Sequence, residues 1–207
     1  MRRLLALPES PMQLLPYTPI EYLMSPGAQY IDSGICPDHT TGTMCIYRAE
    51  SRAGLYNYPC GAIDDNGRFY GPGITANTGN LGFGWGSAAR SFTGASAGYN
   101  PLIRAEVRLN FMNDGRACFT NAEISFQEAL VNEEFYINMP IHIFGANNRG
   151  SNVTNYDMRI YEARISRGSD LLRHFVPALD AAGIPCMWDK VSQSFFYNQG
   201  TGSFLAP

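Results

Sequence analysis

The chain has 207 residues, of which 45% are hydrophobic, 13% aromatic and only 16% charged, with a net charge of −3. This length suits a single all-β domain, and such a domain buries roughly 70% of the surface of its unfolded chain, enough for a core without cross-links. The slightly acidic balance excludes nucleic acid as the main partner, because phosphate binding requires a concentrated basic surface.

Residues 1–19 differ in composition from the rest of the chain. Prolines at 8, 11, 16 and 19 forbid a long helix and favour an extended path. The path carries apolar side chains, whereas a disordered tail is usually polar. These residues are therefore predicted to form an extended N-terminal arm that packs either on the chain's own domain or on a neighbouring subunit. The candidate anchoring residues are Leu4, Leu5, Leu7, Leu14 and Leu15.

The N-terminus does not have the pattern of a signal peptide. Its apolar run covers only residues 4–7, and Pro8 and Glu9 interrupt it, whereas a signal peptide has about 7–15 apolar residues. No segment approaches the length of a membrane span. Five scattered cysteines predict free thiols rather than a disulfide framework or a zinc site: Cys36, Cys45, Cys60, Cys118 and Cys186. We therefore expect a protein made without Sec export that folds in a reducing cytoplasm.

Residues 20–207 alternate between strand and turn signals and are predicted to form one β-domain. Strands are predicted at 30–35, 43–48, 57–63, 67–70 and 80–85. The clearest period-two pattern lies at 106–111. The turn at 113–115 tolerates positive φ, so residues 117–120 are predicted to complete a hairpin. More strands are expected at 141–145, 156–165, 171–176 and 194–197. The apolar phase shifts within 156–165, which indicates a bulge or burial of both faces. Only residues 123–132 have a composition that suits a helical turn.

Short motifs near the two ends of this domain carry a family resemblance. They read QYIDSGI at 29–35, LRHFVP at 172–177, GIPCMWD at 183–189, FFYN at 195–198 and GTG at 200–202. This ordered series resembles the concanavalin A-like (laminin-G-like) modules of gut-bacterial surface proteins and phage structural proteins. The resemblance implies an all-β, two-sheet antiparallel jelly-roll sandwich in which residues 30–35 lie close to 194–197. It also implies a structural role for Trp188 and Asp189.

Catalytic patterns of related sandwiches are missing from the chain. A retaining β-glucanase needs two carboxylates about 5–5.5 Å apart, and the Glu-x-Asp-x-x-Glu and Glu-x-Asp-x-Glu spacings that supply them do not occur. Glu133 and Glu134 are adjacent, so on a strand they would face opposite sides. His39, His142 and His174 stand far apart in the sequence. The chain is therefore predicted not to be an enzyme.

Glycan binding requires aromatic rings for the apolar faces of sugars and amides for their hydroxyl groups. Trp85 and Tyr99 lie among glycines and serines, and Asn147, Asn148 and Arg149 form a polar loop, so these five residues are the candidate carbohydrate-binding set. The glycines around Trp85 have another interpretation, in which they let aromatic rings lie against a neighbouring backbone.

Calcium is left open by the resemblance, because several laminin-G relatives bind it through loop oxygens. Asp64, Asp65 and Asn66 could donate such oxygens, although a plain turn fits the same residues. No other cofactor is expected.

The function expected from these features is non-catalytic recognition of host or mucus glycans on the surface of a phage virion. The alternative is a purely structural capsid or tail decoration protein, anchored by the arm and without a ligand. Either role implies an oligomeric assembly made in the host cytoplasm. A bacterial protein of the cytoplasm, or of the cell surface by a non-Sec route, is the alternative location.

Overall fold

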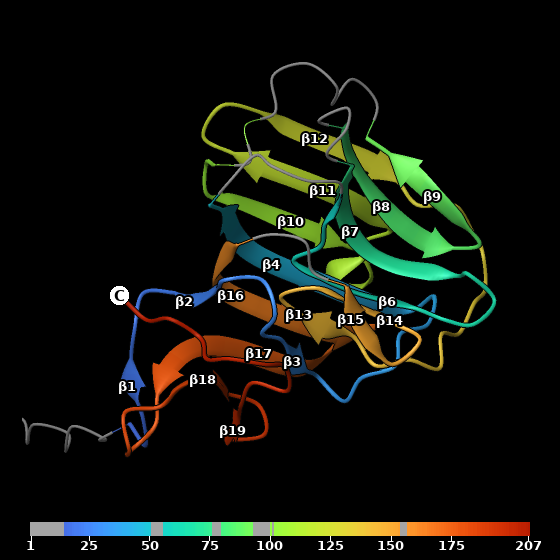
Figure 1. Cartoon of the computed structure of the whole chain (residues 1–207). Coiled ribbons are helices and arrows are strands. Elements are labelled where there is room, and N and C mark those ends of the chain that lie inside the picture. Colours follow the sequence, from blue (N-terminus) through green and yellow to red (C-terminus); the bar gives the residue numbers. More distant parts are fainter. Residues whose placement is uncertain (1–14, 51–55, 76–79, 93–99, 101, 154–156) are drawn as a thin grey trace, which may run out of the picture.

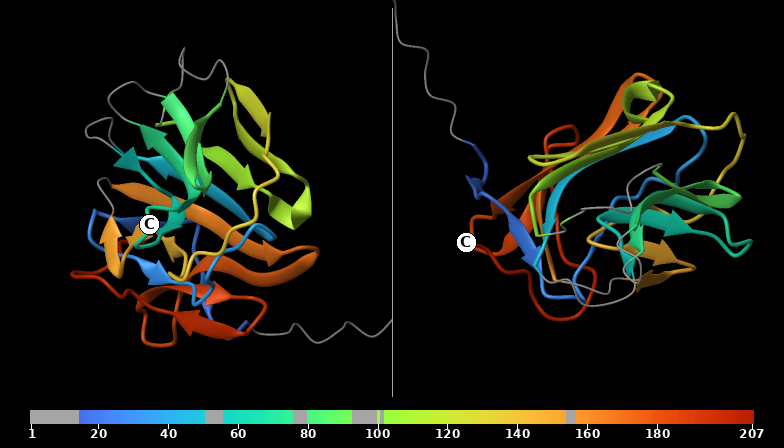
Figure 2. Two further views of the ribbon diagram at one scale, coloured as in Figure 1. Left: turned by 90° about the vertical axis from the view of Figure 1, so that its right-hand side faces the viewer. Right: turned by 90° about the horizontal axis from the view of Figure 1, so that it is seen from above.

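Two β-sheets face each other across one hydrophobic core (Figures 1 and 2). The computed structural model describes residues 15–50, 56–75, 80–92, 100, 102–153 and 157–207. Within these residues the only helical element is a single 3-10 turn, η1 (Phe111–Asn113), and no helix is long and apolar enough to cross a bilayer. The expected all-β sandwich is confirmed.

The larger sheet has the order β12-β11-β10-β4-β16-β17-β18-β19, with β1 beside β17 and β2 beside β16. All of its pairs are antiparallel. Its strands are β1 (Thr18–Pro19), β2 (Leu23–Ser25), β4 (Thr41–Ala49), β10 (Ala105–Leu109), β11 (Arg116–Asn121), β12 (Ser125–Ala129), β16 (Met158–Arg167), β17 (Asp170–Leu179), β18 (Pro185–Asp189) and β19 (Ser194–Phe196).

The smaller sheet has the order β15-β14-β6-β7-β8-β9, and β13 joins β3 to β6 while β5 pairs with β7. One short pair, β14 with β6, is parallel, and the others are antiparallel. Its strands are β3 (Ile31–Asp32), β5 (Tyr56–Asn57), β6 (Cys60–Ile63), β7 (Phe69–Thr75), β8 (Asn80–Gly86), β9 (Ala88–Ser91), β13 (His142–Ile143), β14 (Ala146–Asn148) and β15 (Ser151–Val153).

The period-two pattern at 106–111 gives the strand β10, whose residues alternate between buried and half-buried along its length. It pairs with β11 as the predicted hairpin. The turn between them holds Asn110, Met112 and Asn113 at positive φ, which a non-glycine residue adopts only at a cost. Residues 123–132 contain β12 rather than a helical turn. Alternating exposure and pairing with β11 outweigh the weak helical composition there.

The phase shift within 156–165 is a β-bulge. The register of β16 against β4 shifts between Ile160 and Glu162, so the side chains beyond the shift change faces. The free-thiol prediction is also confirmed: all five cysteines are unpaired, and every one except Cys36 is buried.

The two ends of the domain meet, as the resemblance implies, but they do so without pairing as strands. The amide of Tyr30 donates to Asn198 Oδ1 at 3.2 Å, and the amide of Gln199 donates to the Tyr30 carbonyl at 2.9 Å. Asn198 Nδ2 also donates to the carbonyls of Gly200 and Gly202. The FFYN and GTG motifs therefore form a clasp around the backbone of Tyr30.

The base of the predicted arm packs on the chain's own larger sheet. Tyr17 stacks on Trp188 with ring centroids 5.2 Å apart, and β1 then pairs with β17. This contact closes a small second hydrophobic cluster on that sheet. Leu15, just before it, is 56% exposed. The other candidate anchoring residues, Leu4, Leu5, Leu7 and Leu14, lie outside the described residues, so their role stays a prediction.

Replacing Tyr17 with alanine is expected to lower the free energy of unfolding by about 1 kcal/mol, because the mutation removes one ring of an aromatic pair. Trp188 should also become more exposed. The measurement is tryptophan fluorescence together with thermal unfolding, with a red shift of the emission expected in the folded state. Tyr136→Ala, at an exposed tyrosine, is the control. An unchanged spectrum in Tyr17→Ala would show that the arm base does not cover Trp188.

Candidate functional site

The outer face of the smaller sheet carries a line of residues that crosses five strands. Gly84 on β8 pairs with Gly71 on β7, and the register places Gly61 on β6 beside Gly71. His142 on β13 pairs with Gly61 on one side and with Asp32 on β3 on the other. Residues directly opposite each other share a face of the sheet, so these five positions form one continuous strip (Figure 1 labels the strands).

Aromatic rings cover the glycine part of this strip. A methyl group on Gly84 would overlap the Phe69 ring, and one on Gly61 would lie 3.2 Å from the same ring. Tyr58 contacts Gly73 in the same way and meets Phe69 edge to face, with centroids 5.2 Å apart. The glycines therefore let rings approach the backbone, which is the second interpretation that the sequence offered for the residues around Trp85.

Tyr30 stacks on His142 near the other end of the strip. Their rings stack with centroids 4.3 Å apart and planes inclined by 20°. Tyr30 also lines an open groove of about 500 Å³, here called the Tyr30 groove. The groove is bounded by Gly27, Ala28, Tyr30, Gly150, Ser151, Asn152, Gln199, Gly200 and Thr201. A half-buried ring thus meets hydroxyl, amide and backbone groups from three separate segments of the chain.

Asn152 connects the groove to the stacked pair. Its Oδ1 lies 2.9 Å from His142 Nδ1. Its Nδ2 is buried and has no hydrogen-bond partner among the described residues. An unpartnered buried amide costs about 1–3 kcal/mol, so an acceptor that draws this amide toward the groove would remove that cost.

Burial lowers the pKa of His142, and this effect outweighs the opposing influence of Asn152 and Asp32. The folded state therefore holds the neutral ring, with Nδ1–H donating to Asn152. The unfolded chain binds the proton more readily than the folded chain. The contribution of His142 to the free energy of unfolding is therefore fully present above the ordinary pKa of 6.5 and declines as the pH falls below it. The pKa of His174 is lowered in the same direction, mainly by burial and by Arg164.

We expect urea unfolding at pH 5 to occur at a lower midpoint than at pH 7.5, and His142→Gln to reduce that difference. Only part of the difference should disappear, because His174 titrates in the same sense. His39→Gln, at an exposed histidine, is the matched control. A pH dependence that is identical in His142→Gln and the native chain would contradict this role of His142.

Trp85 belongs to the core, which corrects the prediction that its ring stacks on a sugar. It is 3% exposed, meets Phe135 edge to face at 4.9 Å and donates from Nε1 to the Val131 carbonyl at 3.1 Å. Both ring faces are therefore unavailable to a ligand. Trp85 is also among the residues that line a second pocket of about 400 Å³, together with His39 and Glu133.

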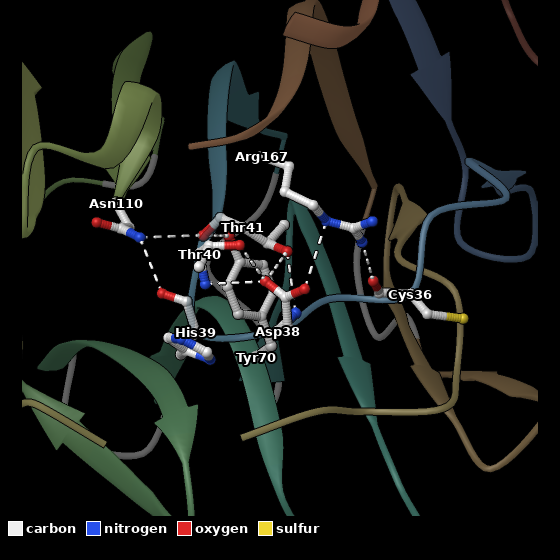
Figure 3. Close-up of polar contacts among 8 residues, drawn as sticks. All are labelled: Cys36, Asp38, His39, Thr40, Thr41, Tyr70, Asn110 and Arg167. Atoms are coloured by element: carbon white, nitrogen blue, oxygen red, sulfur yellow. Dashed lines mark hydrogen bonds and ion pairs between the residues drawn. The ribbon is translucent and has the colours of Figure 1, made fainter. Parts of the chain in front are cut away.

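The turn before β4 fixes the backbone beside this second pocket (Figure 3). Asp38 Oδ1 accepts hydrogen bonds from the Thr40 amide and hydroxyl and from the Thr41 hydroxyl, at 2.7–3.0 Å. Arg167 Nε lies 3.4 Å from Asp38 Oδ2. Burial opposes ionisation, but these hydrogen bonds and the guanidinium lower the pKa of Asp38. The carboxylate is engaged in holding the turn, which is a structural role.

The predicted polar loop lies at the hairpin of β14 and β15, next to the Tyr30 groove. Asn147 is buried, and its amide donates to the Pro140 carbonyl while its Oδ1 accepts from the Gly150 amide. This corrects its assignment as a ligand contact, since it stabilises the hairpin. Asn148 is half-buried on β14 and Arg149 is exposed, but neither lines the groove. Tyr99 lies outside the described residues.

The candidate set drawn from the sequence lacks Tyr30, Asn152, Gln199 and Thr201, although Asn152 ends the polar loop at 147–152 that the sequence indicates. Tyr30 belongs to the QYIDSGI motif, but this motif indicated the fold and not a binding site. The other signal was the GTG motif, whose pairing with the start of the domain brings Gln199 and Thr201 beside Tyr30.

The possible calcium ligands form a closed turn. Asp64 Oδ1 accepts from the amides of Asn66 and Arg68, and Asp64 Oδ2 lies 2.7 Å from Arg68 Nε. Despite burial, these contacts lower the pKa of Asp64. Asp65 has a side chain that is 73% exposed. No cluster of three or more His, Cys, Asp or Glu side chains that could hold a metal is present in the described part of the chain. These residues therefore fit the plain-turn interpretation.

Comparison with known proteins identifies the fold. No family model and no curated protein matches the chain. A solved structure from Bacteroides ovatus, described as a "putative carbohydrate binding protein", superposes with a TM-score of 0.56 at 11% identity. The match covers 91% of this chain and 60% of that protein. This likeness shows the fold alone, a two-sheet β-sandwich of the kind seen in that structure. Domains LG4-5 of the mouse laminin α1 chain match with a TM-score of 0.40 at 13% identity, over 72% of this chain and 40% of that chain.

Proposed function

We propose that this concanavalin A-like sandwich is a non-catalytic carbohydrate-recognition module that binds glycans in the Tyr30 groove. The observation that carries the proposal is the composition of this groove. A tyrosine ring held by stacking on His142 stands beside Ser151, Asn152 and Thr201, so an apolar face and several hydroxyl or amide groups converge on one open space. Sugars present the same two kinds of surface. The carbohydrate-binding description of the Bacteroides ovatus structure is consistent with this assignment.

The described residues at the Tyr30 groove do not supply the acids that glycoside hydrolysis requires. None of the described residues that line it is a carboxylate, whereas a glycosidase places two carboxylates at the scissile bond. The sequence GASAG at 94–98 satisfies the Gly-x-Ser-x-Gly pattern of serine hydrolases and lies outside the described residues. The nucleophile elbow of those enzymes joins a strand to a helix, whereas the described elements on either side of this segment, β9 and β10, are both strands.

We further propose that the module is displayed in many copies on a phage virion and contacts host or mucus glycans. The support is the likeness of its end motifs to modules of phage structural proteins. One shallow sugar site contributes roughly 4 kcal/mol, a millimolar affinity. Display of many copies raises the avidity by about 10²–10⁴ without new contacts, so an assembly compensates for a weak single site.

The test is binding of the purified chain to a broad glycan array, first as a monomer and then coupled to a multivalent particle. Tyr30→Ala should reduce binding about tenfold or more, because it removes the stacking surface while leaving the backbone clasp. Tyr197→Ala is the matched control, since this exposed tyrosine belongs to the neighbouring FFYN motif but does not line the groove. The proposal fails if the multivalent form binds no glycan, or if both variants bind like the native chain.

A purely structural decoration protein is the second candidate. The observation that favours it is the arm base, where Tyr17 is anchored on Trp188 and Leu15, just before it, is exposed. Deleting residues 1–14 keeps Tyr17 and should leave the domain folded while abolishing incorporation into an assembly. A truncated chain that still assembles would remove this candidate.

A further inference from the structure

Three arginines lie side by side on the outer face of the larger sheet, opposite in the molecule to the sheet that carries the Tyr30 groove. Arg48 on β4 and Arg159 on β16 are directly opposite each other. Ala105 pairs with Tyr47, so Arg104, one residue earlier, comes beside Arg48. We call these three residues the arginine row. Like charges opposite each other on neighbouring strands destabilise a sheet, so other interactions must offset the repulsion between these arginines.

Two tyrosines hold the arginine row in place. The Arg159 guanidinium lies 4.2 Å from the centroid of the Tyr22 ring, and that of Arg104 lies 4.0 Å from the centroid of the Tyr161 ring. The two rings contact each other edge to face at 5.9 Å. A guanidinium stacked on a ring keeps the donors at its edge free for a planar acceptor such as a carboxylate. The row is therefore preorganised rather than a set of flexible surface cations.

The positive charge of the row is only partly neutralised. Glu50 Oε1 accepts a hydrogen bond from Arg48 Nε at 2.9 Å, and Glu50 Oε2 accepts one from Arg159 Nη2 at 3.0 Å. In the described part of the chain, no ion pair links Arg104 to a carboxylate. The three cations of the row thus share one ion-paired carboxylate, although the whole chain carries −3. A further anion at the row would relieve the repulsion.

We propose that the arginine row is a docking site for an acidic segment of a partner protein. Further along the same strands, two residues beyond Arg104 and, because of the bulge, three beyond Arg159, Glu106 and Glu162 both stand opposite Ile46 on the same face. Glu106 pairs with Arg108, and Glu162 pairs with Arg164 and His174. These glutamates are therefore neutralised, and the excess positive charge on this face is confined to the arginine row. A short protein segment with a few spaced carboxylates can meet all of that charge, whereas a longer polyanion would gain nothing from the neutralised residues beyond it.

The residue types support the same choice of partner. Arginine and tyrosine are enriched among the residues that dominate binding at protein interfaces. The acidic segment would bring its carboxylates to Arg104 and Arg48, where the edges of the guanidinium groups still offer donors. This inference does not depend on the proposed glycan site, because it uses the other sheet.

The test uses the full chain and the peptide acetyl-Glu-Ser-Glu-Ser-Glu-amide as the probe, in about 50 mM salt, where surface charges are weakly screened. Binding is measured by titration calorimetry or by NMR shifts. Arg104→Gln should weaken it about fivefold, the upper end for an exposed ion pair. Arg108→Gln is the matched control, because it removes a charge from the same strand at a residue already paired with Glu106. This variant should bind within about twofold of the native chain.

Arg159→Lys provides a second variant that keeps the charge but loses the planar contact with Tyr22. Arg159→Lys should weaken binding in the same direction as Arg104→Gln. Because Arg104 is exposed, the melting temperature of Arg104→Gln should equal that of the native chain, which is the folding control. A heparin hexasaccharide is the polysaccharide arm of the test. The proposal is overturned if the peptide does not bind, if Arg108→Gln weakens binding as much as Arg104→Gln, or if the heparin fragment binds more tightly than the peptide through the arginine row.

Discussion

Replacing Asp189 with alanine is expected to lower the free energy of unfolding by about 3–5 kcal/mol, one of the two largest effects in this protein. Asp189 is fully buried at the end of β18. Its Oδ1 accepts from the amides of His174, at 2.7 Å, and Val191, at 3.1 Å. Its Oδ2 accepts from the Ser192 amide and hydroxyl. Removing the carboxylate leaves four donors without their acceptor and breaks the turn into β19.

Arg173 adds to the cost of this mutation. Its Nη1 lies 3.6 Å from Asp189 Oδ2, so alanine also leaves a partly buried guanidinium without its carboxylate. Asp189→Asn keeps the shape and should lose less stability, since its carbonyl still accepts some of the hydrogen bonds. The measurement is denaturant unfolding, with Asp170→Ala at an exposed position of β17 as the control. A loss below about 1 kcal/mol for Asp189→Ala would contradict the structural role that the family resemblance implied.

Replacing Gly71 with alanine should be similarly damaging, with an expected loss of about 3–5 kcal/mol. Two causes combine at this position. Gly71 has φ +133°, which an L-residue rarely adopts. A methyl group there would also lie 2.5 Å from the Cys60 carbonyl oxygen and 2.8 Å from Gly61 Cα, and neither backbone atom can move without separating β6 from β7.

Gly67→Ala separates these two causes. Gly67 also has a positive φ, +75°, but a methyl group there would meet nothing within 4 Å. Its loss should therefore be limited to the conformational cost of about 1–2 kcal/mol. Comparing the two variants by denaturant unfolding isolates the steric part. Equal losses for both would show that the strip tolerates a side chain at Gly71, and that the close approach of β6 and β7 is not required.

Local pattern was sufficient to predict several elements of this fold. The alternation at 106–111 and the turn after it specified the β10–β11 hairpin, and the phase shift at 156–165 specified the bulge in β16. The short strands β2, β14 and β15 were not predicted, because segments of three residues carry too little alternation to be distinguished from turns.

The candidate site was predicted less well than the fold. Trp85 looked like a ligand contact because it stands among glycines, but alternation on β8 turns its ring into the core and turns the glycines outward. The rings on the outer face come instead from Tyr58 and Phe69, whose neighbours are set by the pairing of β7 with β8 and β6. Tyr30 becomes part of a groove only through the clasp that residues 198–202 form around it.

The amino-acid sequence by itself determined the all-β class and the free state of the thiols, because alternation and cysteine spacing are local properties, and the family resemblance of the end motifs implied that the chain ends meet. The tertiary structure alone decided which rings face outward, where the Tyr30 groove lies and that three arginines become neighbours. The physical reason is strand register: a shift of one residue moves every side chain to the opposite face, and the partner that fixes the register is distant in the sequence.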